Sequence, residues 1–220
     1  MDVAEIVQSV SLIVAALSVV FGVNAWQREF VGKRRIELAE DALALFYEAR
    51  DAIRYIRSPL GHVGEGSSRQ AAENESPREK EIYDRASVVF ERYNKHQELF
   101  NKIHSMRYRF ISHFGKGAAQ PFDDLRSIVN DIFFSSFMLA RYWSEQDRRY
   151  WRNDEERQKH LQEIDRWEAV FWDRLSDKDP ITPRLEAVVL GIETRCRAII
   201  ERKTIEQRAW GFISKLWQRE

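Results

Sequence analysis

The pattern of hydrophobic and polar positions begins with an uncharged run near the N-terminus. The 22 residues from Ile6 to Gln27 include no charged side chain, and at about 1.5 Å per residue they form a helix about 33 Å long. That length crosses the hydrocarbon core of a bilayer. The pattern therefore predicts a transmembrane anchor over residues 1–32.

Two other interpretations of this run stay open. A cleavable signal peptide could end at Val23-Asn24-Ala25, although the chain begins with Asp2 and Glu5 and lacks the basic start that such signals carry. The run could also be a buried core helix, although it is longer than a core helix needs. The acidic start and the length favour the anchor.

Small and polar residues within the run share one face. Steps of four and three residues place them on a single stripe of the helix. In lipid, helices associate through small residues that permit close approach and through polar groups that bond across the contact. The stripe predicts self-association or a polar path, and a lone anchor whose serines bond their own backbone is the alternative. Its packing or pore-lining residues are Gln8, Ser11, Ala15, Ser18 and Gly22.

The charges that flank the run predict its orientation. Basic residues follow the run and none precedes it, which places the rest of the chain in the cytoplasm. Aromatic rings favour the headgroup level, so Trp26 belongs at the inner interface. The expected location is a bacterial inner membrane, crossed once. The predicted interface residues are Trp26, Arg28, Lys33, Arg34 and Arg35 and, near the C-terminus, Trp210 and Trp217.

Helical periodicity continues through the rest of the chain. Apolar residues recur at spacings of three and four, Gly and Pro are few, and no strand-like alternation occurs. The predicted fold class is all-α: a transmembrane helix followed by a cytoplasmic bundle of about four to five helices. This helical domain covers residues 33–203, and its expected helices are 33–57, 77–115, 121–144, 153–175 and one opened by Thr182 as cap and Pro183.

Several segments of this domain carry more specific expectations. Residues 33–57 have two apolar stripes, which predict a central helix with two packing partners. Residues 58–77 are rich in Gly, Pro and small polar residues and predict a mobile loop. The apolar run 131–143 is expected to form the core, and Asn153 is expected to cap the helix that follows it. Residues 204–220 predict an amphipathic helix on the inner membrane surface, with an ordinary bundle helix as the alternative.

Charge and motifs exclude several classes of function. The 35 basic and 35 acidic residues cancel, so a net field that attracts nucleic acid is absent, and nucleic acid is not an expected partner. Cys196 is the only cysteine, which excludes an internal disulfide. Nucleotide-binding, zinc-protease and serine-hydrolase motifs are missing. His160, Glu156 and Glu163 share a helix face, but such a trio is typical of a solvated ion-pair face, and neither metal nor cofactor is expected.

One stretch, RYRFISH from Arg107 to His113, resembles the Arg-x4-6-His signature of the HEPN ribonuclease superfamily. The resemblance implies a helical fold in which Arg107 and His113 handle the scissile phosphate and the 2′-hydroxyl proton of RNA, usually in a dimer. Arg57 and His62 match the same spacing, which is frequent by chance in a chain so rich in arginine. The alternative is an ion-paired Arg107 and a His113 that favours the end of its helix.

The layout of anchor, KRR flank and helical domain resembles small bacterial single-pass membrane proteins. At the level of layout and RYRFISH, it also resembles the membrane-anchored, HEPN-like accessory protein of RNA-targeting (type VI) CRISPR systems. That resemblance implies an oligomer that permeabilises the membrane during phage defence. Three functional hypotheses follow: a pore-forming effector assembled through its anchor, a membrane-tethered ribonuclease, and an adaptor that recruits a partner protein. The expected partners are the lipid bilayer and further copies of the chain.

Overall fold

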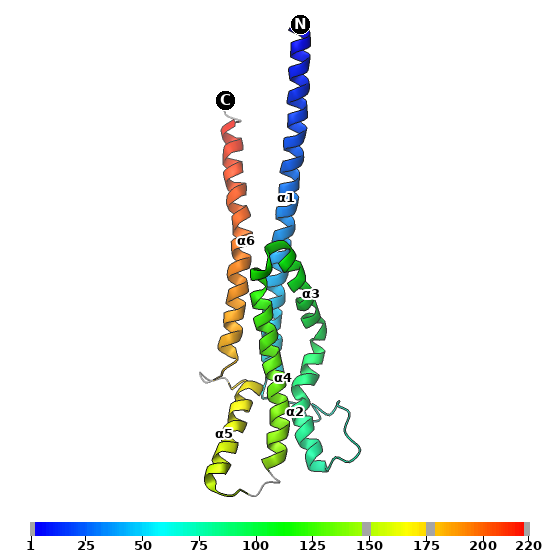
Figure 1. Ribbon diagram of the computed structural model, residues 1–220, viewed down its shortest axis with the longest axis vertical. Coiled ribbons are helices and arrows are strands. Elements are labelled where there is room, and N and C mark those ends of the chain that lie inside the picture. Colours follow the sequence, from blue (N-terminus) through cyan, green and yellow to red (C-terminus); the bar gives the residue numbers. More distant parts are fainter. Residues whose placement is uncertain (1–2, 147–150, 175–178, 218–220) are drawn as a thin grey trace. The chain divides into compact units, whose positions relative to one another are not determined.

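The computed structural model describes residues 3–146, 151–174 and 179–217, with side chains at 8, 11, 12, 14–146, 151–174 and 179–201. Within these residues the chain is all-α, as predicted, and has no strand (Figure 1). Its elements are α1 (Val3–Ile56), α2 (Pro77–Lys95), α3 (Gln97–Phe114), the 3-10 helix η1 (Lys116–Ala119), α4 (Gln120–Gln146), α5 (Asp154–Phe171) and α6 (Thr182–Trp217).

The chain divides into two compact units. One consists of Met1–Asp41 with Cys196–Glu220, and the other of Ala42–Arg195. Helix α1 is 54 residues long and passes through Gly32 without interruption, while α6 is 36 residues long and passes residue 204 in the same way. The predicted boundaries at residues 32 and 203 thus fall inside continuous helices, and the separate roles of the segments beyond them stay predictions.

Alanines at one end of α1 let its neighbours approach closely. In the unit Ala42–Arg195, Phe46 of α1 meets Phe122 of α4 edge-on, with 4.8 Å between ring centroids. Buried residues of α1 come from both predicted stripes, because the helix packs on two sides. In this unit they are Ala42, Phe46, Ala49, Ala52, Ile53 and Ile56. Helix α4 adds the buried residues Leu125, Ile128, Ile132 and Leu139, and α6 adds Leu185, Val189 and Ile192.

Helix starts agree with local sequence signals. Ser76 accepts a hydrogen bond from the backbone N–H of Glu79, whose side chain accepts from the N–H of Ser76, a capping box followed by Pro77 at the first position. Asn153 caps α5 by accepting from the N–H of Glu156 at 2.9 Å. Both starts were predicted. The start of α6 differs, because Thr182 is already helical and the capping carboxylate comes from Asp179.

The single helix expected over residues 77–115 is wrong. The chain leaves helical geometry at His96, with φ −110° and ψ 14°, and forms α2 and α3 instead. Neither glycine nor proline marks this position, so the local sequence carries no break signal. The imidazole of His96 lies edge-on to Tyr55 at 5.5 Å. The break raises the number of α-helical segments in the unit Ala42–Arg195 to six among the described residues.

The apolar run 131–143 is only partly core. Ile132, Leu139 and Trp143 are buried, but Phe134 and Phe137 are 54% and 68% exposed. Successive residues of a helix are about 100° apart, so this run has apolar side chains on every face, and the described part of the chain leaves the face with Phe134 and Phe137 uncovered. The expectation that this run forms the core is thus confirmed for its inner face and wrong for Phe134 and Phe137.

Candidate functional site

The first half of α1 exposes an apolar surface that no described part of the chain covers. Side chains from Leu12 to Val31 are 49–67% exposed. Because Val19, Val20 and Phe21 are consecutive, they point in three directions around the helix. An exposed apolar surface of this extent marks a contact with lipid or protein. It comprises Leu12, Val14, Leu17, Val19, Val20, Phe21, Val23, Trp26, Phe30 and Val31.

The stripe predicted to pack or line a pore occupies the remaining face of the same half of α1. Gln8, Ser11, Ala15, Ser18 and Gly22 are all exposed. Ser18 Oγ donates to the carbonyl of Val14 at 2.8 Å, so its hydroxyl is satisfied within its own helix. A side chain added at Gly22 would meet nothing within 4 Å. The stripe is thus accessible, and no side chain of the described part of the chain covers it at Gly22.

The predicted interface residues of α1 follow the apolar surface. Trp26 and Phe30 stack with 5.9 Å between ring centroids. Arg28 Nε donates to the carbonyl of Asn24 at 3.2 Å, and Arg34 lies 3.5 Å from Glu37. Lys33, Arg34 and Arg35 are exposed. The side chains of Trp210 and Trp217 lie outside the described ones.

Within the part of the chain that the structure describes, none of the helices is long and apolar enough to cross a membrane. The side chains of residues 1–7, 9, 10 and 13, which belong to the predicted anchor, lie outside the described part. The anchor therefore stays a prediction.

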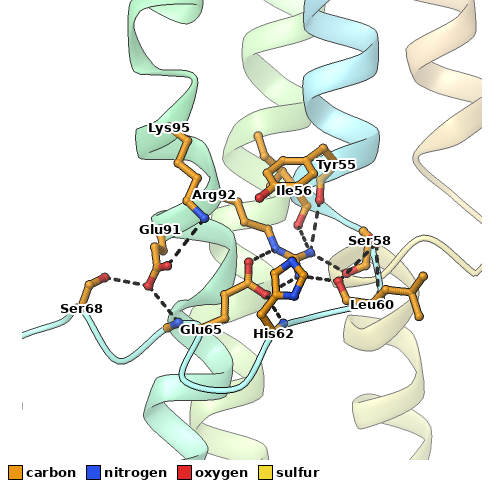
Figure 2. A network of polar contacts seen from close by, with 11 residues as sticks. Tyr55, Ile56, Ser58, Leu60, His62, Glu65, Ser68, Glu91, Arg92 and Lys95 are labelled. Atoms are coloured by element: carbon orange, nitrogen blue, oxygen red, sulfur yellow. Dashed lines mark hydrogen bonds and ion pairs between the residues drawn. The ribbon is translucent and has the colours of Figure 1, made fainter.

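A buried arginine of α2 closes the other end of α1 (Figure 2). Arg92 is 1% exposed and donates to the carbonyls of Tyr55 and Ile56 at 3.2 Å, Ser58 at 2.6 Å and Leu60 at 2.8 Å. These carbonyls lie at and beyond the C-terminus of a helix, where backbone acceptors lack partners and a cation is favoured. Arg92 thus stabilises the end of α1 and the loop that follows it.

The carboxylate of Glu65 completes this network. Its two oxygens accept from Arg92 at 2.7 and 2.8 Å, and one of them accepts from the N–H of His62 at 3.2 Å (Figure 2). The Arg92 hydrogen bonds lower the pKa of Glu65 to about 2, although burial opposes this. Glu65 therefore stays ionised at neutral pH. This contact ties the first half of the loop 58–77 to α2, and the predicted mobility of that loop is untested.

Glycine is required where the same loop crosses α2. Gly66 has φ +88°, and a Cβ there would lie 1.9 Å from the carbonyl oxygen of Asp84. Its N–H donates to Glu91 at 2.9 Å, and Ser68 Oγ donates to the same carboxylate at 2.8 Å (Figure 2). The loop therefore follows the surface of α2 closely.

A second buried arginine joins three further segments. Arg57 donates to the carbonyls of Ala169 and Trp172 at 2.9 Å and Val170 at 2.8 Å, which form the C-terminal end of α5, and to Asp179 at 2.9 Å. Asp179 in turn accepts from the N–H groups of Ile181 and Thr182 at the start of α6. Burial opposes ionisation of Asp179, but the Arg57 contact and these N–H donors outweigh it and lower the pKa.

The two arginines form a structural framework. The donors of Arg92 and Arg57 are directed at carbonyls and carboxylates of the chain itself. A hollow of about 460 Å³ lies beside Arg92, with His62, Glu81, Asp84 and Trp172 in its wall. Because Asp84 is also bonded to Arg69 at 2.7 Å and the Arg92 donors are used internally, this wall offers little for a ligand.

The residues that resemble the HEPN signature are not brought together as a pair. Arg107 is bound to both oxygens of Asp123, at 2.8 and 3.1 Å, which confirms the predicted ion pair. His113 follows six residues later in α3, about 9 Å along the helix and about 240° around it. Arg57 is buried in the framework, while His62 is exposed in the loop. Whether the chain cleaves RNA is untested.

The sequence predicted that His160 belongs to a solvated ion-pair face, and this prediction is wrong. His160 is 6% exposed and lies against the rings of Trp151 and Tyr142, with centroid distances of 4.8 and 5.3 Å. Its Nε2 has no hydrogen-bond partner among the residues that the structure describes. The described residues contain no group of His, Cys, Asp or Glu side chains arranged to hold a metal.

The framework was missed by sequence reasoning, although one signal was present. Arg92 follows Val88 and Val89 at the spacing of an apolar stripe, so an arginine occupies a core position of α2. Such a residue requires a buried acceptor, but its partner Glu65 lies in the loop and is not identifiable from spacing. Arg57 likewise follows the buried Ile53 by four residues.

Comparisons with known proteins leave this chain without an assigned relative. No family model matches it, and neither a curated protein nor a solved structure shows significant similarity.

Proposed function

We propose that this protein is anchored in a bilayer by the first half of α1 and assembles with further copies through the stripe Gln8, Ser11, Ala15, Ser18 and Gly22. The observation that carries the proposal is the exposure of apolar side chains on every face of α1 between Leu12 and Val31 except that of the stripe. The assembled anchors form a pore or otherwise disrupt the membrane, while the unit Ala42–Arg195 lies in the cytoplasm.

Lipid accounts for this surface better than a single protein partner. Covering a Leu, Val or Phe side chain stabilises by about 1.5–3 kcal/mol, so leaving the nine exposed Leu, Val and Phe side chains of this surface in water is strongly unfavourable. A partner helix covers one face, whereas acyl chains cover all of them. The uncharged length matches the hydrocarbon core, and the exposed Lys33, Arg34 and Arg35 follow it at the position favoured on the cytoplasmic side.

The stripe supports assembly because it is the flattest face of this helix. Ala15, Ser18 and Gly22 permit close approach of a second helix. The internal hydrogen bond of Ser18 removes the need for a polar partner across that contact. Gln8 is the largest polar group of the stripe, and in an assembly it lies against a neighbouring helix or a water-filled path.

The anchor is tested by placing a charge within it. An arginine near the middle of a membrane helix costs about 2.5–3.5 kcal/mol, so Val19→Arg should shift the full chain from the carbonate-resistant membrane pellet towards the soluble fraction. The matched control is Val63→Arg, because Val63 is fully exposed in the loop and lies outside the anchor. Wild-type protein that is extracted by carbonate as readily as Val19→Arg would contradict the anchor.

Assembly is tested separately, by light scattering of detergent-extracted protein. We expect an oligomer that Gly22→Leu dissociates and that Val20→Leu, which lies off the stripe, leaves intact. Expression of the wild-type chain should depolarise the membrane, and Gln8→Leu should reduce that effect. A monomer in detergent would contradict assembly and leave the anchor standing. An oligomer without depolarisation would contradict the pore and favour an adaptor.

A further inference from the structure

A groove separates α3 from α4 within the unit Ala42–Arg195, and it is independent of the anchor. Its volume is about 260 Å³. Four aromatic rings, from Tyr93, Phe100, Phe122 and Phe133, contribute to its apolar lining. Polar side chains come from both helices, so the groove combines an aromatic floor with a polar rim, as small-molecule sites do.

Aromatic rings packed on one another and one hydroxyl line the floor. Tyr93 stacks on Phe100 with 4.6 Å between centroids and an interplanar angle of 21°, and Phe133 meets Tyr93 edge-on at 4.9 Å and 81°. Burial raises the pKa of Tyr93, so its hydroxyl stays a donor at neutral pH. Among the described residues, this hydroxyl has no hydrogen-bond partner, and it is therefore available to a ligand.

The rim carries a cation that the chain leaves uncompensated. Arg107 is engaged by Asp123, but Arg126 is exposed and has no ion-pair partner among the described residues. His104 also lies on the rim, edge-on to Tyr108 at 5.2 Å. An arginine that is free to form two parallel hydrogen bonds is suited to a carboxylate or a phosphate.

Two amides widen the hydrogen-bonding capacity of the rim. Asn101 belongs to α3 and Asn130 to α4, and both are exposed where they line the groove. Each amide offers donors and an acceptor to the edge of a heteroatom-bearing ring. An acyl chain would use neither these amides nor the Tyr93 hydroxyl, whereas a planar ring with polar edges uses both.

We propose that this groove binds a small planar aromatic anion, with its ring against Tyr93 and Phe133 and its acidic group on Arg126. The volume lies just below the range of roughly 300–1,000 Å³ typical of drug-sized sites, so the ligand has one or two fused rings. Aromatic carboxylates and nucleoside monophosphates share this chemistry.

Equilibrium dialysis of the full chain in lipid nanodiscs tests the proposal, with empty nanodiscs as the blank. The probes are indole-3-acetate, adenosine monophosphate, uncharged indole and inorganic phosphate. We expect indole-3-acetate or adenosine monophosphate to bind at least about tenfold more tightly than indole or phosphate, a difference of about 1.4 kcal/mol. Tighter binding of indole-3-acetate identifies the ligand as an aromatic carboxylate, and tighter binding of adenosine monophosphate identifies it as a nucleotide.

Two variants connect binding to the groove. Arg126→Ala should weaken binding of the preferred probe by about tenfold or more, and Tyr93→Phe should weaken it several-fold. The matched control is Arg109→Ala, which removes the same charge from an exposed position of α3 outside the groove and should leave binding unchanged. Unchanged far-UV circular dichroism and melting temperature verify folding of each variant.

Several results would overturn the proposal. The first is that neither aromatic anion binds at millimolar concentration. The second is that phosphate alone binds as well as adenosine monophosphate, and the third is that folded Arg126→Ala binds as tightly as wild type. Equal weakening by Arg109→Ala would also overturn it, because binding would then depend on overall charge and not on the groove.

Discussion

At the scale of single residues, Arg92 and Glu65 show how this protein stabilises charges inside its core. Their side chains are 1% and 6% exposed and have lost almost all contact with water. The cost of that desolvation is offset only when geometry is good and the remaining donors are satisfied. Four carbonyls and a carboxylate satisfy Arg92, so removal of one partner should leave a buried charge uncompensated.

We expect Glu65→Gln to lower the free energy of unfolding by roughly 3 kcal/mol at pH 7. The folded-state pKa of Glu65 is about 2, below the ordinary value of 4.5. Its contribution is therefore complete above pH 4.5 and is lost as the pH falls from 4.5 towards 2. Urea unfolding of the full chain in mild detergent, followed by circular dichroism, measures the difference between variant and wild type across this range.

The control for this measurement is Glu155→Gln. Glu155 is 74% exposed and bonds to Lys159 on the same helix face, so its loss should change the free energy of unfolding by less than about 0.5 kcal/mol. A difference between Glu65→Gln and wild type that is the same at pH 7 and pH 2 would refute the role of the Glu65 charge.

At the scale of elements, a buried serine in the apolar run 131–143 joins α4 to α2. Ser136 Oγ donates to the carbonyl of Ala86 in α2 at 2.6 Å, while the adjacent Ser135 Oγ donates to Ile132 in its own helix at 2.7 Å. Both serines are buried. Only one of the two hydroxyls therefore links separate helices.

Replacing each serine by alanine separates these two roles. We expect Ser136→Ala to lower the free energy of unfolding by about 1 kcal/mol, because a buried bond between helices is lost. Ser135→Ala should cost less than about 0.5 kcal/mol, because its bond is local and alanine is the better helix former. Urea unfolding measures both, and equal costs would mean that the contact with α2 contributes nothing beyond the local bond.

At the scale of the whole molecule, two helices connect its compact units. Helices α1 and α6 each continue from one unit into the other without a break in their hydrogen bonding. The proposed anchor occupies one of these helices, so the first residues and the loop 58–77 should lie on opposite sides of the bilayer.

Cysteine labelling of cells tests this topology. Cys196 is fully buried, and burial raises its pKa to about 12, so the native thiol should be inert to a maleimide. Under the proposed orientation, Ala4→Cys reacts with a membrane-impermeant maleimide in intact spheroplasts, whereas Val63→Cys reacts only after lysis. Labelling of both positions before lysis would refute a cytoplasmic helical unit.

The sequence by itself determined what depends on near neighbours in the chain. Spacings of three and four residues predicted an all-α fold, and Pro77 and Asn153 predicted where α2 and α5 begin, because helix starts depend on backbone groups only two or three residues away.

Only the tertiary structure decided what depends on distant pairings. Arg92 and its partner Glu65 are 27 residues apart in the sequence, and Arg57 and Asp179 are 122 residues apart. The periodicity of apolar residues does not specify such pairs. The exposure of Phe134 and Phe137, the burial of His160 and the break at His96 depend in the same way on which helices lie alongside. Periodicity specifies which residues share a helix face, but the packing of whole helices decides whether that face is covered.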